Sequence, residues 1–147
     1  DYHRAINKPI HYNSKLYEGY MAGGTNALLD GYRGGLTYLD GRWQGYLDDL
    51  DCVIDMEEET DIHKVSIRFM QLTGPGVFQP GQVELLTSED GENFISRGIV
   101  PTTVPADDPD LLFQEYTFDG NWKTRYIRLK APRANPGFIF ADEIVVW

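Results

Sequence analysis

Apolar and polar side chains alternate along several short stretches of the chain. In residues 63–69, HKVSIRF, every second position from Val65 to Phe69 is apolar. A period of two is the pattern of a β-strand with one buried face and one face in water. Nowhere do apolar residues recur at helical spacing for more than about two turns. The sequence therefore predicts an all-β protein.

Turn residues divide the chain into further strand-like pieces. Residues 82–98 form a hairpin pattern in which Asp90-Gly91 supplies the turn between two strand-like runs. Seven or eight short strands favour a two-layer sandwich over a parallel sheet with helices, and we predict a jelly-roll β-sandwich of about eight antiparallel strands. The other expected strands lie at 50–56, 111–118, 124–130 and 138–147.

The first 45 residues are rich in loops, and we expect them to wrap one end of the sandwich. The segment AGGTNALLDGYRGG carries five glycines, and a short helical turn is expected near residues 26–29. No internal repeat, low-complexity tract or linker divides the sequence, and 147 residues are enough to bury one continuous core. Residues 1–147 are therefore interpreted as a single domain that includes a loop-rich N-terminal portion, residues 1–45.

The chain is strongly acidic, with 13 Lys and Arg against 23 Asp and Glu and a formal charge of −10. Eight of the acids lie between Trp43 and His63, where no Lys or Arg occurs. Nucleic acids and anionic membranes attract proteins through Lys and Arg, so neither is expected as a partner. No apolar run reaches the roughly 18 residues of a membrane-spanning helix. The chain starts at Asp1 rather than Met, which we interpret as a piece excised from a longer protein.

The sequence offers no constellation for catalysis. The three histidines, His3, His11 and His63, are scattered, and no serine-nucleophile elbow or zinc-protease motif is present. The single cysteine, Cys52, permits no internal disulfide and is expected to be buried between apolar neighbours. Acids are abundant, but none is paired in a context that indicates a raised pKa. We predict no catalytic residues and no enzymatic activity.

Three segments in order carry a recognisable pattern: NALLDGYRGG leading to WQGY and DCVIDM, then QVELLTSEDGENF, then RYIRLKAP followed by GFIFADEIVVW. Together they resemble the discoidin-like domain, also called the coagulation factor V/VIII type C domain, and within it the family 32 carbohydrate-binding modules. The resemblance covers about residues 20 to 147. More narrowly, the chain resembles the C-terminal module of bacterial family 20 glycoside hydrolases, the β-hexosaminidases and chitobiases. DGRWQGY and FADEIVV are its most specific pieces.

The resemblance implies an eight-stranded jelly roll that often carries one structural calcium ion. Asp30 matches the family position whose carboxylate binds the metal, and Glu143 matches the carboxylate that completes the shell from the last strand. Asp40 is a further candidate ligand. A shared ion would clip the first loop onto the final strand. The alternative is that Asp30 caps a turn and Glu143 is an exposed strand residue.

The resemblance also implies a carbohydrate site in loops at one end of the sandwich. Such a site needs an aromatic face for the apolar side of a sugar and planar polar groups for its hydroxyls. Trp43 and Trp122 are interpreted as structural, because each precedes a strand. The candidate carbohydrate-binding residues are Arg42, Gln44, Phe78, Arg133, Asn135 and Phe138.

From these features we expect a non-catalytic module that targets an attached glycoside hydrolase of the hexosaminidase or chitobiase type to glycans. The expected partners are an N-acetylhexosamine or galactose-type sugar and the parent catalytic domain, in a secreted, cell-surface or periplasmic setting. The alternative is a structural domain that packs against its parent catalytic domain without binding glycan. Two segments, TGPGVFQPG and APRANPG, support that alternative, because related modules carry tryptophan-bearing loops there. A lipid-adhesion role is disfavoured by the charge.

Overall fold

The computed structural model describes residues 2–147. All of its regular elements are strands except two single turns of 3-10 helix, and neither helix is long and apolar enough to cross a membrane. In chain order the elements are β1 (Ile10–Tyr12), η1 (Glu18–Tyr20), η2 (Ala27–Leu29), β2 (Gln44–Tyr46), β3 (Leu50–Gln71), β4 (Gln82–Ser88), β5 (Ile95–Pro101), β6 (Leu112–Ala131) and β7 (Ile139–Val146).

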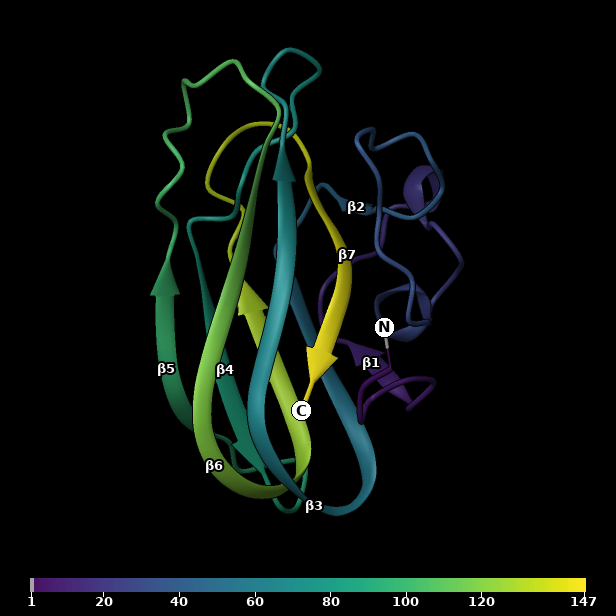
Figure 1. Cartoon of the computed structure of the whole chain (residues 1–147), viewed down its shortest axis with the longest axis vertical. Coiled ribbons are helices and arrows are strands. Elements are labelled where there is room, and N and C mark those ends of the chain that lie inside the picture. Colours follow the sequence, from purple (N-terminus) through teal and green to yellow (C-terminus); the bar gives the residue numbers. More distant parts are fainter. Residues whose placement is uncertain (1) are drawn as a thin grey trace.

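Two long strands, β3 and β6, build both layers of the sandwich. They pair antiparallel along their length, from Leu50 opposite Ala131 to Gln71 opposite Leu112, with register shifts near the middle of β3. Both strands bend at the lower end of the view in Figure 1. On one side of the bend β3 pairs with β1, and β6 pairs with β4, which pairs with β5. On the other side β3 pairs with β7, which pairs with β2.

The predicted all-β antiparallel sandwich is confirmed, and residues 2–147 form seven strands where about eight were expected. The sequence pattern separated residues 50–56 from 63–69, whereas the structure continues them as β3. The reason is that no Gly or Pro interrupts residues 50–71. The strand bends through a bulge at Glu57, whose φ is +72°, instead of stopping. β6 also joins two expected strands, at 111–118 and 124–130, although Gly120 lies between them.

The apolar core lies between the two layers. One layer contributes Cys52 and Ile54 from the first half of β3, and the other contributes Ile67 and Phe69 from its second half. Cys52 is fully buried, as its apolar neighbours predict. Every residue of β7 is buried, because this strand lies between β2 and β3 and η2 packs against it. Polar residues on β7 therefore have to find partners inside the protein.

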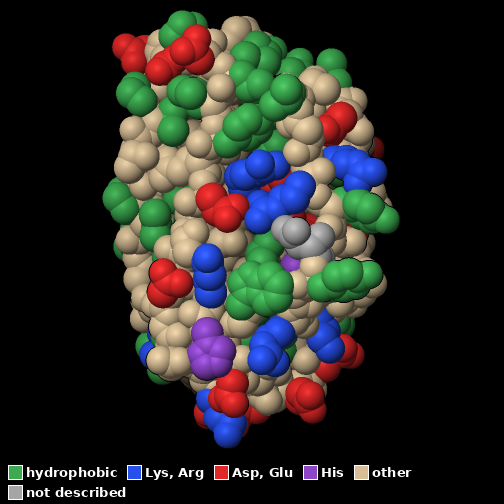
Figure 2. All heavy atoms as spheres, in the orientation of Figure 1, with side chains coloured by type: hydrophobic (Ala, Val, Ile, Leu, Met, Phe, Trp, Pro, Cys, Tyr) green, Lys and Arg blue, Asp and Glu red, His purple; other side chains and the backbone are tan. Residues whose placement is uncertain are grey.

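The loops gather at one end of the sandwich, the upper end in Figure 1, where the β3–β4, β5–β6 and β6–β7 connections meet. The N-terminal portion, with η1, η2 and β2, lies along the side of β7. On the face shown in Figure 2, apolar side chains gather at the same upper end. The β4–β5 hairpin and the bends of β3 and β6 form the opposite end.

Candidate functional site

Backbone hydrogen bonds join the β3–β4 loop to the β6–β7 loop. The Phe78 amide donates to the Phe138 carbonyl at 2.9 Å, and the Phe138 amide donates to the Gly76 carbonyl at 2.8 Å. Gly137 has φ of +141°, and a Cβ there would lie 2.3 Å from the Gly76 oxygen, so only glycine permits the approach. The pairing brings together the two loops that carry four predicted carbohydrate residues, namely Phe78, Arg133, Asn135 and Phe138.

Arg133 is exposed and is held at both its backbone and its side chain. Its amide donates to Asp49 Oδ1 at 2.8 Å, and its Nε donates to the Gly137 carbonyl at 2.7 Å. The two terminal guanidinium nitrogens make no hydrogen bond or ion pair with any described residue. Arg133 therefore presents an oriented pair of free donors at the loop end.

The structure corrects the prediction for Gln44. This side chain is 1% exposed and lies under the N-terminal loops rather than at a rim. Its Nε2 donates to the Met21 carbonyl at 3.1 Å and to the Gly24 carbonyl at 2.9 Å. Its Oε1 accepts hydrogen bonds from the Tyr12 and Tyr46 hydroxyls. Because its donors and its acceptor are used within the protein, Gln44 is not available to a sugar.

Trp43, the residue before Gln44, is also buried and anchors the loop that leads into β2. It is 1% exposed, and its Nε1 donates to the Gly35 carbonyl at 3.1 Å. Its ring stacks on Phe113 at a centroid distance of 5.8 Å, with the Arg68 guanidinium 5.1 Å from its centroid. The structural interpretation of Trp43 is confirmed.

Arg42 is exposed, but it does not contact the two paired loops. Its Cζ lies 4.4 Å from the centroid of the Tyr32 ring, which is itself 58% exposed. The contacts of Arg42 therefore place it with Tyr32 on the N-terminal loops, and none of them joins it to Phe78 or Arg133.

An aromatic cluster that the sequence analysis missed lies beside the β6–β7 loop. Tyr17 and Tyr20 stack at 5.6 Å, and each meets Phe138 edge-on, at 5.0 and 5.1 Å. Tyr20 also meets Tyr38 at 6.0 Å and Phe140 at 5.1 Å. Phe138 is thus a half-buried member of a five-ring group, which we call the aromatic cluster: Tyr17, Tyr20, Tyr38, Phe138 and Phe140.

Each tyrosine of the stacked pair lines its own hollow. Tyr20 lines a hollow of about 410 Å³ between η1 and the segment 38–43, which we call the tyrosine hollow. Tyr17, which is 37% exposed, lines a hollow of about 320 Å³ with Leu47. The tyrosine hollow is bounded by Glu18, Gly19, Tyr20, Met21, Ala22, Tyr38, Leu39, Gly41 and Trp43.

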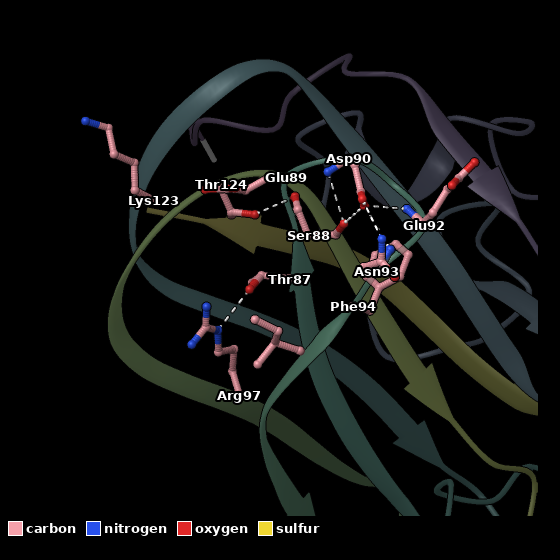
Figure 3. A pocket seen from close by; sticks show the side chains of 11 residues that line it. Thr87, Ser88, Glu89, Asp90, Glu92, Asn93, Phe94, Arg97, Lys123 and Thr124 are labelled. Carbon is pink, nitrogen blue, oxygen red and sulfur yellow. Dashed lines mark hydrogen bonds between the residues drawn. The ribbon is translucent and has the colours of Figure 1, made fainter.

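A larger hollow than these two, of about 560 Å³, lies at the other end of the sandwich, around the β4–β5 hairpin (Figure 3). Its central carboxylate is already used by the turn. Asp90 Oδ1 accepts the amides of Glu92 and Asn93 at 2.9 and 2.8 Å, and Oδ2 accepts Asn93 Nδ2 at 2.7 Å. Arg97 donates through Nε to the Thr87 hydroxyl at 2.9 Å. These contacts stabilise the hairpin, so size alone does not make this hollow the functional site.

The candidate cation ligand Glu143 is fully buried, which overturns the alternative of an exposed strand residue. Its Oε2 accepts the Gly31 amide and His3 Nε2, each at 2.8 Å. Its Oε1 is buried without a hydrogen-bond partner among the residues that the structure describes. Burial raises the pKa of Glu143 to about 9, and the neighbouring Asp30 and Asp142 carboxylates push it in the same direction.

The two other predicted ligands differ in their position. Asp30 lies beside Glu143, and its Oδ1 accepts the Tyr32 amide at 2.9 Å. Asp40 uses one carboxylate oxygen for the Gly35 amide and the other for the Arg42 amide, at 2.6 and 2.9 Å. Within residues 2–147, no group of three or more His, Cys, Asp and Glu side chains is arranged to hold a metal.

The residues at Glu143 nevertheless fit a hard cation that draws further ligands from backbone carbonyls. A buried carboxylate oxygen without a donor, beside a second carboxylate, is costly unless a proton or a cation neutralises it. Calcium takes several oxygen ligands, including backbone carbonyls that a tight loop directs inward. Asp30 and Glu143 are therefore the residues that would hold such an ion.

No protein-family model matches the chain, and no curated protein matches it in sequence. Solved structures do match. Chitosan-binding module 1 derived from a chitosanase/glucanase of Paenibacillus sp. IK-5 superposes with a TM-score of 0.67 at 13% identity, over 100% of this chain and 99% of that chain. The CBM32-5 module of Clostridium perfringens GH89, in complex with GalNAc-β-1,3-galactose, gives 0.65 at 18% identity, over 96% and 95%.

A Streptococcus pneumoniae fucose binding module gives a TM-score of 0.65 at 15% identity, over 99% of this chain and 94% of that chain. Across all three, the chain spans nearly the whole of a binding module rather than part of a catalytic domain. At these identities the likeness shows a shared β-sandwich fold.

Proposed function

We propose that this chain is a non-catalytic carbohydrate-binding module that holds a glycan against the aromatic cluster at its loop end. The observation that carries the proposal is the exposed edge of that cluster. Tyr17 is 37% exposed, and it is fixed by stacking on Tyr20 and by its edge contact with Phe138. A preorganised ring offers the apolar face of a sugar a platform without the entropic cost of ordering it on binding.

Polar groups for the sugar hydroxyls stand around this platform. Arg133 is tethered through Gly137, the residue before Phe138, with its terminal nitrogens free. Lys15 and Asp48 line the hollow that contains Tyr17. A flat aromatic group with a few oriented polar groups is the usual composition of a sugar site. The stack contributes about 0.5–1.5 kcal/mol, so we expect weak affinity for a single sugar.

The similar structures support sugar binding in this fold, because they are a chitosan-binding module, a complex with GalNAc-β-1,3-galactose and a fucose binding module. For this chain we propose an N-acetylhexosamine or galactose-type glycan and attachment to a secreted, cell-surface or periplasmic glycoside hydrolase. The hexosaminidase or chitobiase identity of that enzyme rests on the sequence resemblance alone. The module would act by proximity, since tethering raises the effective concentration of substrate at the catalytic domain.

We also propose that one calcium ion is held by Asp30 and Glu143. Bound there, the ion would neutralise the two carboxylates and satisfy the orphaned Glu143 Oε1. Asp30 belongs to the glycine-rich first loop and Glu143 to β7, so the two residues would hold that loop against the sheet.

A glycan-array screen of the chain in calcium, followed by calorimetric titration of any hit, tests the sugar proposal. We expect binding that is lost in Tyr17→Ala and weakened in Arg133→Ala. Tyr2→Ala is the matched control, because Tyr2 is 91% exposed and makes no ring contact with the cluster. Binding that survives Tyr17→Ala would contradict the placement of the site.

The alternative is a domain that packs against its parent enzyme, and one observation favours it. Leu36 and Leu39, in the loop beside the aromatic cluster, are 75% and 67% exposed. Exposed leucines on a neighbouring loop are typical of a protein contact. A blank array from well-folded protein, together with association with the parent catalytic domain that Leu39→Asp removes, would replace the sugar proposal with this one.

A further inference from the structure

We propose that the tyrosine hollow binds the protonated amine of an amino sugar, so that the module prefers glycans with free amines over their N-acetylated counterparts. The inference rests on the proposed function, glycan binding at the loop end, and it ranks free amino sugars above the N-acetylhexosamines named there. The first observation is a carboxylate that has no partner and lies beside aromatic side chains.

The carboxylate is that of Glu18, the first residue of η1. It is exposed, it lines the tyrosine hollow, and it makes no hydrogen bond or ion pair with any described residue. Most other acids near the loop end are used by the protein. Asp40 accepts two amides of its own turn, and Asp48 and Asp49 accept amides of Lys15 and Arg133. Glu18 is therefore a free anionic acceptor positioned for a ligand.

The walls of the hollow are aromatic. Tyr20 and Tyr38 meet there at an interplanar angle of 78°, and both hydroxyls lack a hydrogen-bond partner among the residues described. Aromatic rings attract cations through their quadrupole, so an ammonium group in this hollow would be attracted to the tyrosines that line it. The free hydroxyls can accept hydrogen bonds from an ammonium group or from neighbouring sugar hydroxyls.

The electrostatic surroundings favour a cation as well. No Lys, Arg or His lines the tyrosine hollow. The basic residues nearest in sequence face other contacts, since Lys15 lines the hollow of Tyr17 and the Arg42 guanidinium lies over Tyr32. The chain carries a formal charge of −10. An acidic sugar would be repelled here, whereas a sugar ammonium would be attracted to Glu18.

The hollow also has a suitable size. About 410 Å³ exceeds what one ammonium group needs and lies within the usual range of small-ligand sites. Its position next to Tyr20, which stacks on Tyr17, allows one sugar to sit on Tyr17 while the next places its amine by Glu18. The two hollows would then read consecutive units of one chain.

The test compares glucosamine oligosaccharides with N-acetylglucosamine oligosaccharides of equal length, titrated calorimetrically at mildly acidic pH, where the amines are protonated. We expect tighter binding of the free-amine oligomer, by about three- to tenfold, which is the range for an exposed ion pair combined with a cation–π contact. The preference should decrease with added salt, because the charges are exposed. Glu18→Gln should abolish the preference while keeping the volume of the side chain.

Glu58→Gln is the matched control for the net charge. Glu58 is an exposed acid at the opposite end of the sandwich, and its side chain has no partner among the described residues. If Glu58→Gln reduces the preference as much as Glu18→Gln does, the preference arises from attraction to the whole acidic protein rather than to the tyrosine hollow. Equal affinity of the wild type for both oligomers would also overturn the inference.

The outcomes separate this inference from the function on which it rests. If glycans bind, and Tyr17→Ala removes the binding, but Glu18→Gln leaves the ratio of the two affinities unchanged, the sugar module stands and the amine site is wrong. If no glycan binds to the folded wild type, both are wrong.

Discussion

His3 and Glu143 lie 140 positions apart in the sequence and are joined by a hydrogen bond of 2.8 Å between His3 Nε2 and Glu143 Oε2. Both side chains are fully buried. The Ala5 amide donates to His3 Nδ1 at 3.2 Å, so Nδ1 is unprotonated and Nε2 carries the proton toward the carboxylate. Burial lowers the pKa of His3 to about 4, which agrees with a neutral imidazole. This contact attaches the N-terminal segment to β7.

Replacing His3 by alanine should therefore destabilise the protein. The change removes a donor from a buried carboxylate whose other oxygen already lacks a partner, so we expect a loss of about 1–3 kcal/mol in the free energy of unfolding. Urea unfolding measures it. His11→Ala is the control, because His11 is exposed on β1. Equal stability of the two variants would mean that the His3 contact does not hold the segment.

Calcium should raise the stability of the chain through Asp30 and Glu143. A ligand that binds only the folded state at about 100 times its dissociation constant adds about 2.7 kcal/mol. We expect the unfolding temperature of chelator-treated protein to rise on adding calcium, and the rise to disappear in Asp30→Asn. Asp40→Asn should keep the rise, because both oxygens of Asp40 accept amides in its own turn. Absence of binding heat in the wild type would contradict the proposed ion.

Local sequence patterns were sufficient for the sandwich but not for the full course of its strands. The alternation in residues 63–69 and the Asp90-Gly91 turn are local signals, and both appear in the structure as β3 and the β4–β5 hairpin. β3 is continuous because it passes through a bulge at Glu57. Glu57 has a φ of +72°, although it is not a glycine. The alternation of apolar and polar residues does not predict such a conformation, because tertiary contacts maintain it.

The candidate site was less predictable, because its parts come from distant loops. Loop position correctly indicated that Arg133 is exposed, and the position of Trp43 before a strand indicated its structural role. Gln44 follows Trp43 as the first residue of β2, and only the tertiary structure reveals that carbonyls of the N-terminal loops use its amide. Tyr17 and Tyr20 lie outside any strand pattern. The one signal that could have found them is the density of aromatic residues in the N-terminal portion.

The bend of β3 should give the protein an acid-sensitive contact. Arg125 donates to both carboxylate oxygens of Asp55, at 2.9 and 3.1 Å, and the Glu57 amide donates to Oδ1 at 2.7 Å. The hydrogen bonds from Arg125 hold the pKa of Asp55 below its ordinary value of 3.8. A carboxylate whose pKa is lower in the folded state stabilises the protein above the unfolded-state pKa and loses that contribution as the pH falls through the folded-state pKa.

Asp55→Asn should therefore lower stability at neutral pH, by about 1 kcal/mol or less because solvent screens the partly exposed pair. The difference from the wild type should shrink as the pH drops below about 3.8, the ordinary value for aspartate. Chemical unfolding at a series of pH values measures it, with Asp61→Asn as the control, since Asp61 is exposed and its side chain has no partner among the described residues. A difference that stays constant into acid would rule out the ionised contact.

Gly137→Ala should weaken both the fold and glycan binding, because Gly137 sets the distance between the two loops of the site. Its φ of +141° belongs to a region that essentially only glycine occupies, at a cost of about 1–3 kcal/mol for other residues. The added Cβ would also lie 2.3 Å from the Gly76 carbonyl oxygen, so the β6–β7 loop would have to move, and Phe138 and Arg133 with it.

Gly74→Ala in the facing loop is the matched control, since a Cβ there meets nothing within 4 Å. We expect a lower unfolding temperature and reduced glycan affinity for Gly137→Ala, with both unchanged for Gly74→Ala. Unchanged glycan affinity in a destabilised Gly137→Ala variant would show that the sugar does not depend on the pairing of these loops, and would restrict the site to the face formed by Tyr17 and Tyr20.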